Sequence, residues 1–387
     1  MLNKQLFDKV FILISYTVRG ENDMNRDAFL AKEDIYYERI GINKEVEVWE
    51  DGIRTTGDKG SYEWWYFDAE YSNGCKVVVI FYTKDRFDVR GRSHPTATID
   101  ITLPNGQTVS KWVSEKKNTK IKASREKCYV NIGESLIEYV DGDYKIHFID
   151  EDIEYNCLMK SKVPMYRQDT GYIYFGEKEK DYFAWLVPQP YAEVEGSLKF
   201  NDTIYKSNGT GYHDHNWGNV DMRKVINNWY WCRASIGPYT IIANDIIAEK
   251  RYGYKRVPIF FIAKNGEVLK CNENKIRIFR EDTEEHFLTR KSIDNKLTFI
   301  QENNENESYK IEFFRDHDIF ASSLLNVIGL SKIEILLAKL KGLNPTYLRC
   351  VGFVKLTIKE NDKEVVIEDE ALWEQMFFGE NKKILKM

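Results

Sequence analysis

The stretch Gly209-Thr-Gly-Tyr-His-Asp-His-Asn-Trp-Gly-Asn219 is denser in side chains that can donate or accept a proton than any other part of the chain. It holds two of the six histidines, an aspartate between them and a tryptophan two positions further on. In an extended strand, residues two apart point to the same face, so we expect His213 and His215 on one face and Asp214 on the other. Trp217 follows on the histidine face. The glycines of the stretch permit bends or close approach of backbones.

These residue types have a chemical use in this pattern. A histidine beside a carboxylate can be held charged or in one tautomer, which suits a general acid. An indole beside it is the best side-chain partner for a cation. The stretch is therefore a candidate catalytic centre. The alternative is structural, because Gly, Asn and Asp form turns, Trp often fills a core, and paired histidines often serve only as hydrogen-bonding groups.

Composition bounds the class of protein. The chain has 387 residues, with 43% hydrophobic and 30% charged residues, which is ordinary for a globular protein with room for two domains. Aromatic residues make up 14%, which favours strands and apolar cavities. A net charge of −5 argues against a nucleic-acid partner. None of the six cysteines forms a CxxC pair, which predicts reduced thiols in a cytoplasmic protein.

Strand patterns dominate from Ser61 onward. The apolar run Val77–Tyr82 is typical of a buried strand, and Ala97–Leu103 with Thr108-Val109 flank a Pro-Asn-Gly turn, which predicts a hairpin. Trp65-Tyr-Phe67 is echoed by Trp229-Tyr-Trp231, as if the chain restarted with the same kind of strand. This weak internal repeat suggests two tandem β domains.

One segment breaks the strand pattern. Between Ser322 and Lys341 apolar residues recur at helical spacing, which predicts an amphipathic helix. We favour a helix packed over a barrel end, and a lid or membrane-surface helix is the alternative. The remaining histidines include His147, His286 and His317, which lie in polar or charged surroundings and are expected at the surface.

Three segments together resemble the carotenoid 1,2-hydratase (hydroxyneurosporene synthase) and AttH-like lipocalin family: Glu63-Trp-Trp-Tyr-Phe67, Gly211-Tyr-His-Asp-His-Asn-Trp-Gly218 and Trp229-Tyr-Trp231. The resemblance covers roughly residues 55–375. It implies an all-β fold of two tandem lipocalin-like antiparallel β-barrels, to which the sequence adds a short amphipathic helix in the second. The expected division is a lead-in segment 1–55, a first domain 56–222 and a second domain 223–387.

The family's functional residues carry over only in part. A His-x-Trp pair and a downstream Asp are implicated in the hydratases, and here they match His215, Trp217 and Asp245. The tyrosine expected just before that Asp is absent, because position 243 is Ala. The candidate catalytic residues are Asp245, His215, Trp217, His213 and Asp214. The candidate substrate-binding residues are Glu63, Trp65, Tyr66, Tyr212, Trp229 and Trp231.

The resemblance and the motif together predict an enzyme that protonates a C=C bond of an apolar isoprenoid or polyene, as a hydratase or a cyclase, without a cofactor. A non-catalytic lipocalin-like carrier of a lipid or polyketide is the alternative. A metalloenzyme using His213 and His215 is a third hypothesis, disfavoured because only Asp221 follows as a further ligand. The expected partner is an apolar small molecule and no nucleic acid. The expected location is the cytoplasm, with peripheral membrane contact left open.

Overall fold

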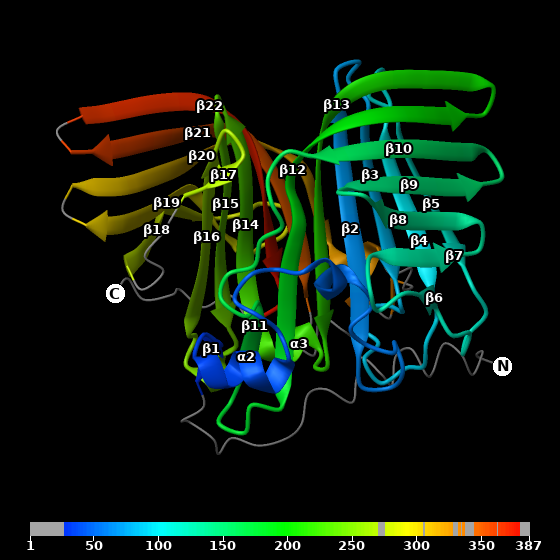
Figure 1. The fold of residues 1–387 in the computed structure, drawn as a ribbon, viewed down its shortest axis with the longest axis horizontal. Helices are drawn as coiled ribbons and strands as arrows, with labels where there is room; N and C mark the ends of the chain where they lie inside the picture. Colours follow the sequence, from blue (N-terminus) through cyan, green and yellow to red (C-terminus); the bar gives the residue numbers. More distant parts are fainter. Residues whose placement is uncertain are drawn as a thin grey trace. The chain divides into compact units, whose positions relative to one another are not determined.

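The computed structural model describes residues 27–269, 275–304, 306–327, 332–333, 335–336, 344–361 and 363–379. Almost all of their secondary structure is antiparallel strand, arranged as two curled sheets (Figure 1). The residues cluster into two compact units. The N-terminal unit comprises Phe29–Met222 with Ala263–Val268, and the C-terminal unit comprises mainly Arg223–Ile262 and the residues from Leu269 onward. The predicted all-β fold class is confirmed.

The N-terminal sheet has 13 strands among the described residues, in the order β5-β4-β3-β2-β13-β12-β10-β9-β8-β7-β6, with β11 on β12 and β1 on β11. Its strands are β1 (Ala28–Leu30), β2 (Tyr62–Tyr71), β3 (Lys76–Tyr82), β4 (Thr96–Thr102), β5 (Thr108–Ser114), β6 (Lys122–Ala123), β7 (Tyr129–Ile132), β8 (Ser135–Val140), β9 (Asp143–Asp150), β10 (Ile153–Ser161), β11 (Tyr172–Phe175), β12 (Asp181–Phe200) and β13 (Thr203–Gly218). The helix α2 (Asp34–Ile40) and the 3-10 turn η1 (Val48–Asp51) precede β2.

The second sheet has nine strands among the described residues, in the order β17-β16-β15-β14-β22-β21-β20-β19-β18. Its strands are β14 (Ile226–Ile236), β15 (Tyr239–Ala248), β16 (Arg256–Lys264), β17 (Glu267–Val268), β18 (Ile276–Glu285), β19 (Ser292–Asn304), β20 (Glu307–Ser323), β21 (Thr346–Glu360) and β22 (Lys363–Phe377). Short helical turns accompany them: α3 (Met222–Val225), η2 (Lys250–Tyr252) and α4 (Leu324–Val327).

The two sheets share one connectivity. In each, a run of hairpins leads away from an aromatic-rich strand, and that same strand pairs on its other side with the last long strand of the sheet. The aromatic strand is β2 beside β13 in one sheet and β14 beside β22 in the other. The two aromatic segments that the sequence relates therefore lie on equivalent strands.

Alternation of side chains explains why the strands form where they do. In β4, Ala97, Ile99 and Ile101 are buried while the threonines and Asp100 between them face outward. The hairpin to β5 turns at Gly106, whose φ of 83° lies in the left-handed region that glycine adopts without strain. The predicted hairpin is confirmed. The inward residues of the sheet form one apolar core.

Large side chains fill the interior of the N-terminal unit. Trp65, Phe67, Phe81, Tyr144 and Phe148 are each at most 2% exposed and belong to the same core cluster. Burying one such side chain stabilises the folded state by about 1.5–3 kcal/mol relative to exposure. The polar residues described below are thus embedded in a dense apolar interior, where an unpaired charge is costly.

The predicted helix between Ser322 and Lys341 is only partly described. β20 continues to Ser323, so the segment begins as a strand, and α4 then spans four residues. Residues 328–331, 334 and 337–341 lie outside the described residues. Among the described residues, no helix has the length and apolar character that crossing a bilayer requires.

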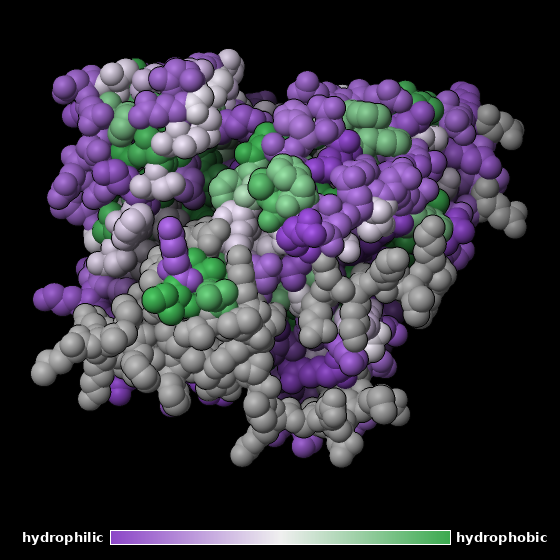
Figure 2. Space-filling view, turned by 180° about the vertical axis from the view of Figure 1, so that it is seen from behind, coloured by the Kyte–Doolittle hydropathy of each residue, from purple (hydrophilic) through white to green (hydrophobic). Residues whose placement is uncertain are grey.

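The molecular face drawn in Figure 2 mixes hydrophilic residues with smaller hydrophobic patches.

Candidate active site

The central motif forms the end of β13, and its register with β2 sorts its side chains onto two faces. His213 pairs with Phe67 and His215 with Trp65, while Asp214 pairs with Tyr66. Side chains of directly opposed residues share a face of an antiparallel sheet. The prediction that the two histidines share one face and Asp214 takes the other is confirmed. Trp217 follows on the histidine face, with its ring centre 4.8 Å from that of His215.

Two carboxylates meet the histidines inside the N-terminal unit. His213 Nε2 lies 3.1 Å from Asp51 Oδ2, and His215 Nε2 lies 2.8 Å from Glu63 Oε1. His215 Nδ1 lies 3.2 Å from Asp51 Oδ1, within ion-pair distance although the N–H is not aligned for a hydrogen bond. All four side chains are fully buried. We call Asp51, Glu63, His213 and His215 the histidine cluster.

Oxygen atoms surround the ring nitrogens of both histidines. Both ring nitrogens of His215 face carboxylates, and those of His213 face Asp51 and the carbonyl oxygen of Tyr66. The two carboxylates beside His215 favour its charged form, and opposite charges in direct contact lower the cost of burying them in an apolar interior.

The pKa values follow the same logic. Burial opposes a charged His215, but the hydrogen bonds and charges of Asp51 and Glu63 outweigh it and raise the pKa of His215. Burial alone would favour a neutral Asp51, but the two histidines hold the pKa of its carboxyl well below the usual range. Aromatic rings pack on both histidines: Trp65 stacks on His215 with centroids 4.5 Å apart, and Phe67 stacks on His213 at 3.9 Å.

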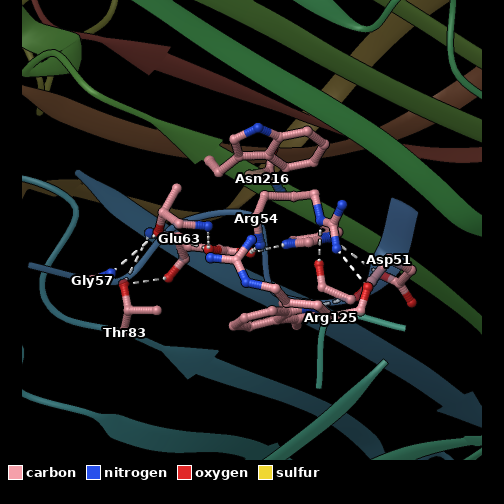
Figure 3. Close-up of polar contacts among 12 residues, drawn as sticks. Asp51, Arg54, Gly57, Glu63, Thr83, Arg125 and Asn216 are labelled. Atoms are coloured by element: carbon pink, nitrogen blue, oxygen red, sulfur yellow. Dashed lines mark hydrogen bonds and ion pairs between the residues drawn. The ribbon is translucent and has the colours of Figure 1, made fainter. Parts of the chain in front are cut away.

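The cluster is completed by residues 48–57, which we call the strap. The backbone N–H groups of Arg54 and Thr55 each donate to Glu63 over 2.6 Å, and the Thr55 hydroxyl donates over 2.7 Å. Figure 3 shows Glu63 near Arg54 and Gly57 of the strap, with Thr83 beside it. Tyr144 donates to Asp51 over 2.6 Å. Hydrogen bonds of the cluster thus join the strap to β2 and β13.

The sequence did not single out the strap. Asp51 falls in the segment assigned to the lead-in, and no periodic pattern marks it. The only local signal is a pair of adjacent carboxylates before a glycine, Glu50-Asp51-Gly52. Gly52 itself is required, because a Cβ there would lie 2.7 Å from the Arg125 backbone.

Asp214 occupies the opposite face in different surroundings. Its Oδ2 accepts hydrogen bonds from the Trp185 indole at 3.1 Å and the Tyr212 hydroxyl at 3.0 Å, and its Oδ1 accepts from Asn216 at 2.7 Å. Burial is the largest influence and raises the pKa of the carboxyl to about 6, although these donors and His213 act in the other direction. Asp214 is 8% exposed. It is therefore a carboxyl that changes charge near neutral pH.

Further aromatic residues share this face of the sheet. The register places Trp64 opposite Asn216, and the half-buried Tyr66 opposite Asp214. Tyr66 donates to Asp68 over 3.1 Å. We call Trp64, Tyr66, Asp68, Tyr212, Asp214, Asn216 and Trp185 the carboxyl face. It combines ring surfaces with a titratable carboxyl, a combination that suits acid–base chemistry on an apolar substrate.

The C-terminal unit holds the other predicted site residues. Asp245 is fully buried on β15, where it pairs with Arg280 at 2.6 Å and Arg256 at 2.9 Å. Both carboxylate oxygens thus face guanidinium groups, which favours a structural role. Trp229 and Trp231 are half-buried on β14, the first against Phe378 and the second under the Arg233 guanidinium.

His286 corrects one expectation. It was expected at the surface, but it is 2% exposed, and its Nε2 lies 2.7 Å from Asp318. Its Nδ1 accepts the N–H of Thr289 over 3.1 Å. The charged residues next to it in sequence are not its partners; the carboxylate that holds it comes from Asp318, 32 positions away. His147, in contrast, lies on the outward side of β9 and bonds Asn156.

One group of side chains has the composition of a metal site. Asp51, Cys128 and His213 each offer a ligand atom, and these atoms lie within 4.8 Å of one another. Burial and the nearby carboxylates raise the pKa of the Cys128 thiol well above its usual value, so the thiol keeps its proton. Both ring nitrogens of His213 are already in contact with oxygen atoms, 3.1 Å from Asp51 Oδ2 and 2.9 Å from the carbonyl oxygen of Tyr66. The donor set does not fit a cation without breaking the histidine cluster.

Comparison with protein-family models gives one match. Residues 155–318, which include the central motif, match the family described as Diels-Alderase-like. Among curated proteins, a hydroxyneurosporene dehydrogenase of Chlorobaculum tepidum is 27% identical over 210 residues, covering 45% of this chain and 53% of that protein. A quinolone epoxide rearrangement protein, asqO of Emericella nidulans, is 30% identical over 83 residues, covering 21% and 22%. The chain thus spans about half or less of these relatives' lengths.

Solved structures match over most of the chain. The crystal structure of CghA aligns with a TM-score of 0.57 at 13% identity, covering 84% of this chain and 90% of that one. A putative AttH from Nitrosomonas europaea aligns with a TM-score of 0.54 at 13% identity, covering 82% and 92%. At this identity the likeness establishes the fold: the chain has the fold of CghA and of the AttH-like protein.

Proposed function

We propose that this chain is an enzyme of the Diels-Alderase-like type that transforms an apolar isoprenoid or polyene by proton transfer at a C=C bond. The named relatives support this class, because their descriptions are a Diels-Alderase-like family, a hydroxyneurosporene dehydrogenase and an epoxide rearrangement protein. Their named reactions differ, so they support an enzyme without specifying the reaction of this chain. The specific outcome for this chain has to come from its own site.

Asp214 is the observation that carries the proposal. A carboxyl with a pKa of about 6 exchanges its proton readily at neutral pH, and about a tenth of the molecules hold it protonated at pH 7. The indole of Trp185 and the ring of Tyr212 surround it. Aromatic faces stabilise the positive charge that develops on a protonated polyene. Asp214 thus replaces Asp245 and His215 as the proposed acid.

The histidine cluster takes a positioning role in this proposal. His213 and His215 are fully buried and lie on the face of β13 that points away from the Asp214 side chain. Their hydrogen bonds fix β13 against β2 and the strap, and this fixes where Asp214 points. The charge of His213 also lowers the pKa of Asp214 somewhat, against the stronger effect of burial. Trp217 caps the cluster on the same side.

The carrier alternative receives less support. A lipocalin-like carrier would hold its ligand inside the barrel, but the interior of the N-terminal unit is filled by Trp65, Phe67, Tyr144 and other fully buried side chains. A titratable carboxyl among aromatic rings has an evident use in catalysis and none in holding an apolar ligand.

The test begins with the ligand and then removes the acid. Protein purified from its own host is analysed by native mass spectrometry and organic extraction, and turnover is assayed with the extracted compound and with hydroxyneurosporene in detergent micelles. We expect Asp214→Asn to lower the rate about 10²-fold or more. The matched control is Asp100→Asn, an exposed aspartate of β4 that accepts a hydrogen bond from Ser110. An Asp214→Asn protein with wild-type turnover would exclude this mechanism, and tight ligand binding without turnover in all forms would favour the carrier.

A further inference from the structure

Two segments of the N-terminal unit carry an excess of positive charge. Residues 84–95 lie between β3 and β4, and residues 115–126 follow β5. Together they contain nine Lys and Arg residues against four Asp and Glu residues, although the net charge of the whole chain is −5. Hydrogen bonds join the two segments: the N–H of Asn118 donates to the Ser93 carbonyl over 2.7 Å, and the Ser93 hydroxyl donates to the Thr119 carbonyl over 2.7 Å. We call the two segments the basic loops.

Most positive side chains of the basic loops lie at the surface. The exposed set includes Arg90, Arg92, Lys116, Lys117, Lys120 and Lys122. Across the described part of the chain, none of the four lysines in this set has a carboxylate partner. Exposed lysines elsewhere in the same unit do pair, as Lys76 does with Glu70 at 2.9 Å and Lys162 with Glu193 at 2.9 Å. The charge of the four loop lysines is therefore open to an external partner.

The acidic residues of the basic loops face backbone groups instead. Asp85 accepts the N–H two positions further on over 2.8 Å, and Asp88 accepts the N–H of Gly91 over 3.0 Å. Glu115 accepts the N–H of Gly133 over 3.0 Å. Three of the four carboxylates are thus held by backbone groups, and the net charge of the loops stays positive.

An exposed tryptophan stands directly before the second basic loop. Trp112 is 68% exposed on β5, which ends at Ser114. β5 lies at the end of the strand order of its sheet. Proteins place tryptophan at the boundary between water and lipid, because the indole ring is apolar and its N–H can still bond polar headgroups. A tryptophan beside lysines therefore has the composition of a membrane-binding surface.

Trp112 also shares a face of the sheet with the proposed acid. Across β4 and β3, it is followed by Thr98 and Ile80. Tyr66 and Asp214 continue the same row on β2 and β13. Directly opposed residues share a face, and four strand spacings put the two ends of the row about 19 Å apart. The three residues between the ends are half-buried, so the row links an exposed edge to the carboxyl face.

We propose that Trp112 and the basic loops form a docking surface for a membrane of anionic lipid. The indole enters the headgroup region, and the exposed lysines lie against headgroup phosphate and carboxylate groups. The inference goes beyond the proposed function and does not depend on the role of Asp214, because it stands on exposure and charge at the sheet edge. Docking at this edge also brings one end of the row to the lipid phase, in which an apolar substrate dissolves.

Charge complementarity selects this partner. A chain with a net charge of −5 is repelled by an anionic membrane except where its own positive charges face the lipid. A nucleic acid also binds lysines, but it needs positive charge along the path of its backbone. Here the path beyond Trp112 runs over the uncharged Thr98 and Ile80, which suits an apolar chain.

Vesicle sedimentation tests the surface on the full chain. Protein is mixed with sucrose-loaded vesicles of phosphatidylcholine and phosphatidylserine, or of phosphatidylcholine alone, and the sedimented fraction is followed as lipid is added. We expect binding to the phosphatidylserine vesicles at about 0.1 M NaCl and loss of most of it at about 1 M, because the Debye length shortens from about 10 Å to about 3 Å. Wild-type protein that ignores the phosphatidylserine vesicles, or that binds both kinds equally, overturns the proposal.

Neutral substitution of three lysines locates the charge. The variant Lys116→Gln/Lys117→Gln/Lys120→Gln should bind the phosphatidylserine vesicles about 10²-fold more weakly, because each basic residue near an anionic surface strengthens binding roughly fivefold. The three side chains have no partner in the described chain, so the variant should fold normally. Wild-type affinity in this variant overturns the proposal.

A matched control removes the same charge elsewhere on the sheet. Lys145, Lys199 and Lys206 are exposed on β9, β12 and β13. The variant Lys145→Gln/Lys199→Gln/Lys206→Gln should bind the vesicles like the wild type. A control as weak as the loop variant would mean that net charge rather than the basic loops governs binding, and the docking surface would be wrong.

Trp112→Ala tests the apolar half of the surface independently. It should lower vesicle affinity roughly tenfold, because a large aromatic side chain no longer leaves water. Ile204→Ala is its control, since Ile204 is 59% exposed on β13. If Trp112→Ala binds the vesicles like the wild type, the lipid surface is wrong. Tighter binding of a short duplex DNA than of the vesicles would make a nucleic acid the partner and would equally overturn the proposal.

Asp214→Asn separates this inference from the proposed function. We expect this variant to bind vesicles like the wild type, because Asp214 lies four strands away from Trp112. If Asp214→Asn stops turnover but the wild type does not bind vesicles, the docking surface is wrong and the proposed function stands. If the vesicles bind and turnover survives in Asp214→Asn, the docking surface stands and the proposed acid is wrong.

Discussion

Replacing Asp214 with Asn should make the fold more stable as it removes activity, and the gain should depend on pH. The pKa of Asp214 is about 6 in the folded protein against an ordinary 3.8. Folded chains therefore bind more protons than unfolded chains between about pH 4 and pH 6, and stability falls as the pH rises through this window. The difference of about two pKa units corresponds to about 3 kcal/mol of lost stability above pH 6.

Asn removes this cost, but its side chain has one acceptor oxygen in place of two. Trp185, Tyr212 and Asn216 donate to both carboxylate oxygens, so at least one donor loses its partner, at a cost of about 1–2 kcal/mol. We therefore expect the variant to be about 1 kcal/mol more stable than the wild type at pH 8. The hydrogen-bond loss is nearly independent of pH, so the variant should gain about 1 kcal/mol relative to the wild type between pH 5 and pH 8.

Urea unfolding at pH 5 and pH 8 measures this, with tryptophan fluorescence as the signal and Asp100→Asn as the control. The control aspartate is exposed, so its substitution should give the same small change at both pH values. An Asp214→Asn protein that is less stable than the wild type at pH 8, or whose difference does not change with pH, would refute the reasoning. It would mean that Asp214 is an ordinary paired carboxylate and no candidate for the acid.

Asp51→Asn should do the opposite and lower the free energy of unfolding by about 3–5 kcal/mol, because it removes the buried carboxylate that both His213 and His215 contact. Thermal unfolding should show this as a Tm lowered by about 10 °C, and an unchanged Tm would contradict a pairing role for Asp51. The difference in free energy of unfolding between this variant and the wild type should shrink as the pH rises past 6.5. The stabilisation that comes from the raised pKa of His215 is present below that value and is lost above it. Gly209→Ala should yield little soluble protein, because its Cβ would lie 1.9 Å from the Glu70 carbonyl oxygen; normal expression would show that the strands can separate there. Asp245→Asn should destabilise by about 3–5 kcal/mol by stranding two guanidinium groups, yet leave the pH profile of turnover in place, and a shifted profile would restore Asp245 as the acid.

The elements that sequence predicted well are those that follow a period. Alternation in 96–102 and the Asn105-Gly106 turn predicted a hairpin because side-chain direction and backbone sterics act locally. The two faces of the 209–219 motif followed from the same period of two. His286 was misjudged because a polar neighbourhood in sequence was taken as exposure, whereas Asp318, which holds it, lies 32 positions away.

Only part of the candidate site could be predicted from the sequence, for a related reason. His213 and Asp214 stand out in composition, but Asp51 is joined to His213 across 162 positions and belongs to no regular strand. Nothing in the local sequence of 48–57 distinguishes a strap that enters the core from an exposed turn. The assignment of roles also needed the structure, because burial and hydrogen-bond partners, rather than residue type, separate the saturated histidines from the titratable Asp214.

The distance along the chain between strap and motif has a consequence for how the protein is made. Asp51 leaves the ribosome well before His213 and His215, and until they arrive its carboxylate has no cationic partner among the cluster residues. The nascent N-terminal unit can pair hairpins such as β3–β4 early, but it cannot close its polar centre before β13 is complete. Synthesis arrested before residue 213 should therefore leave a protease-sensitive chain, and release of the last strand should convert it in one cooperative step.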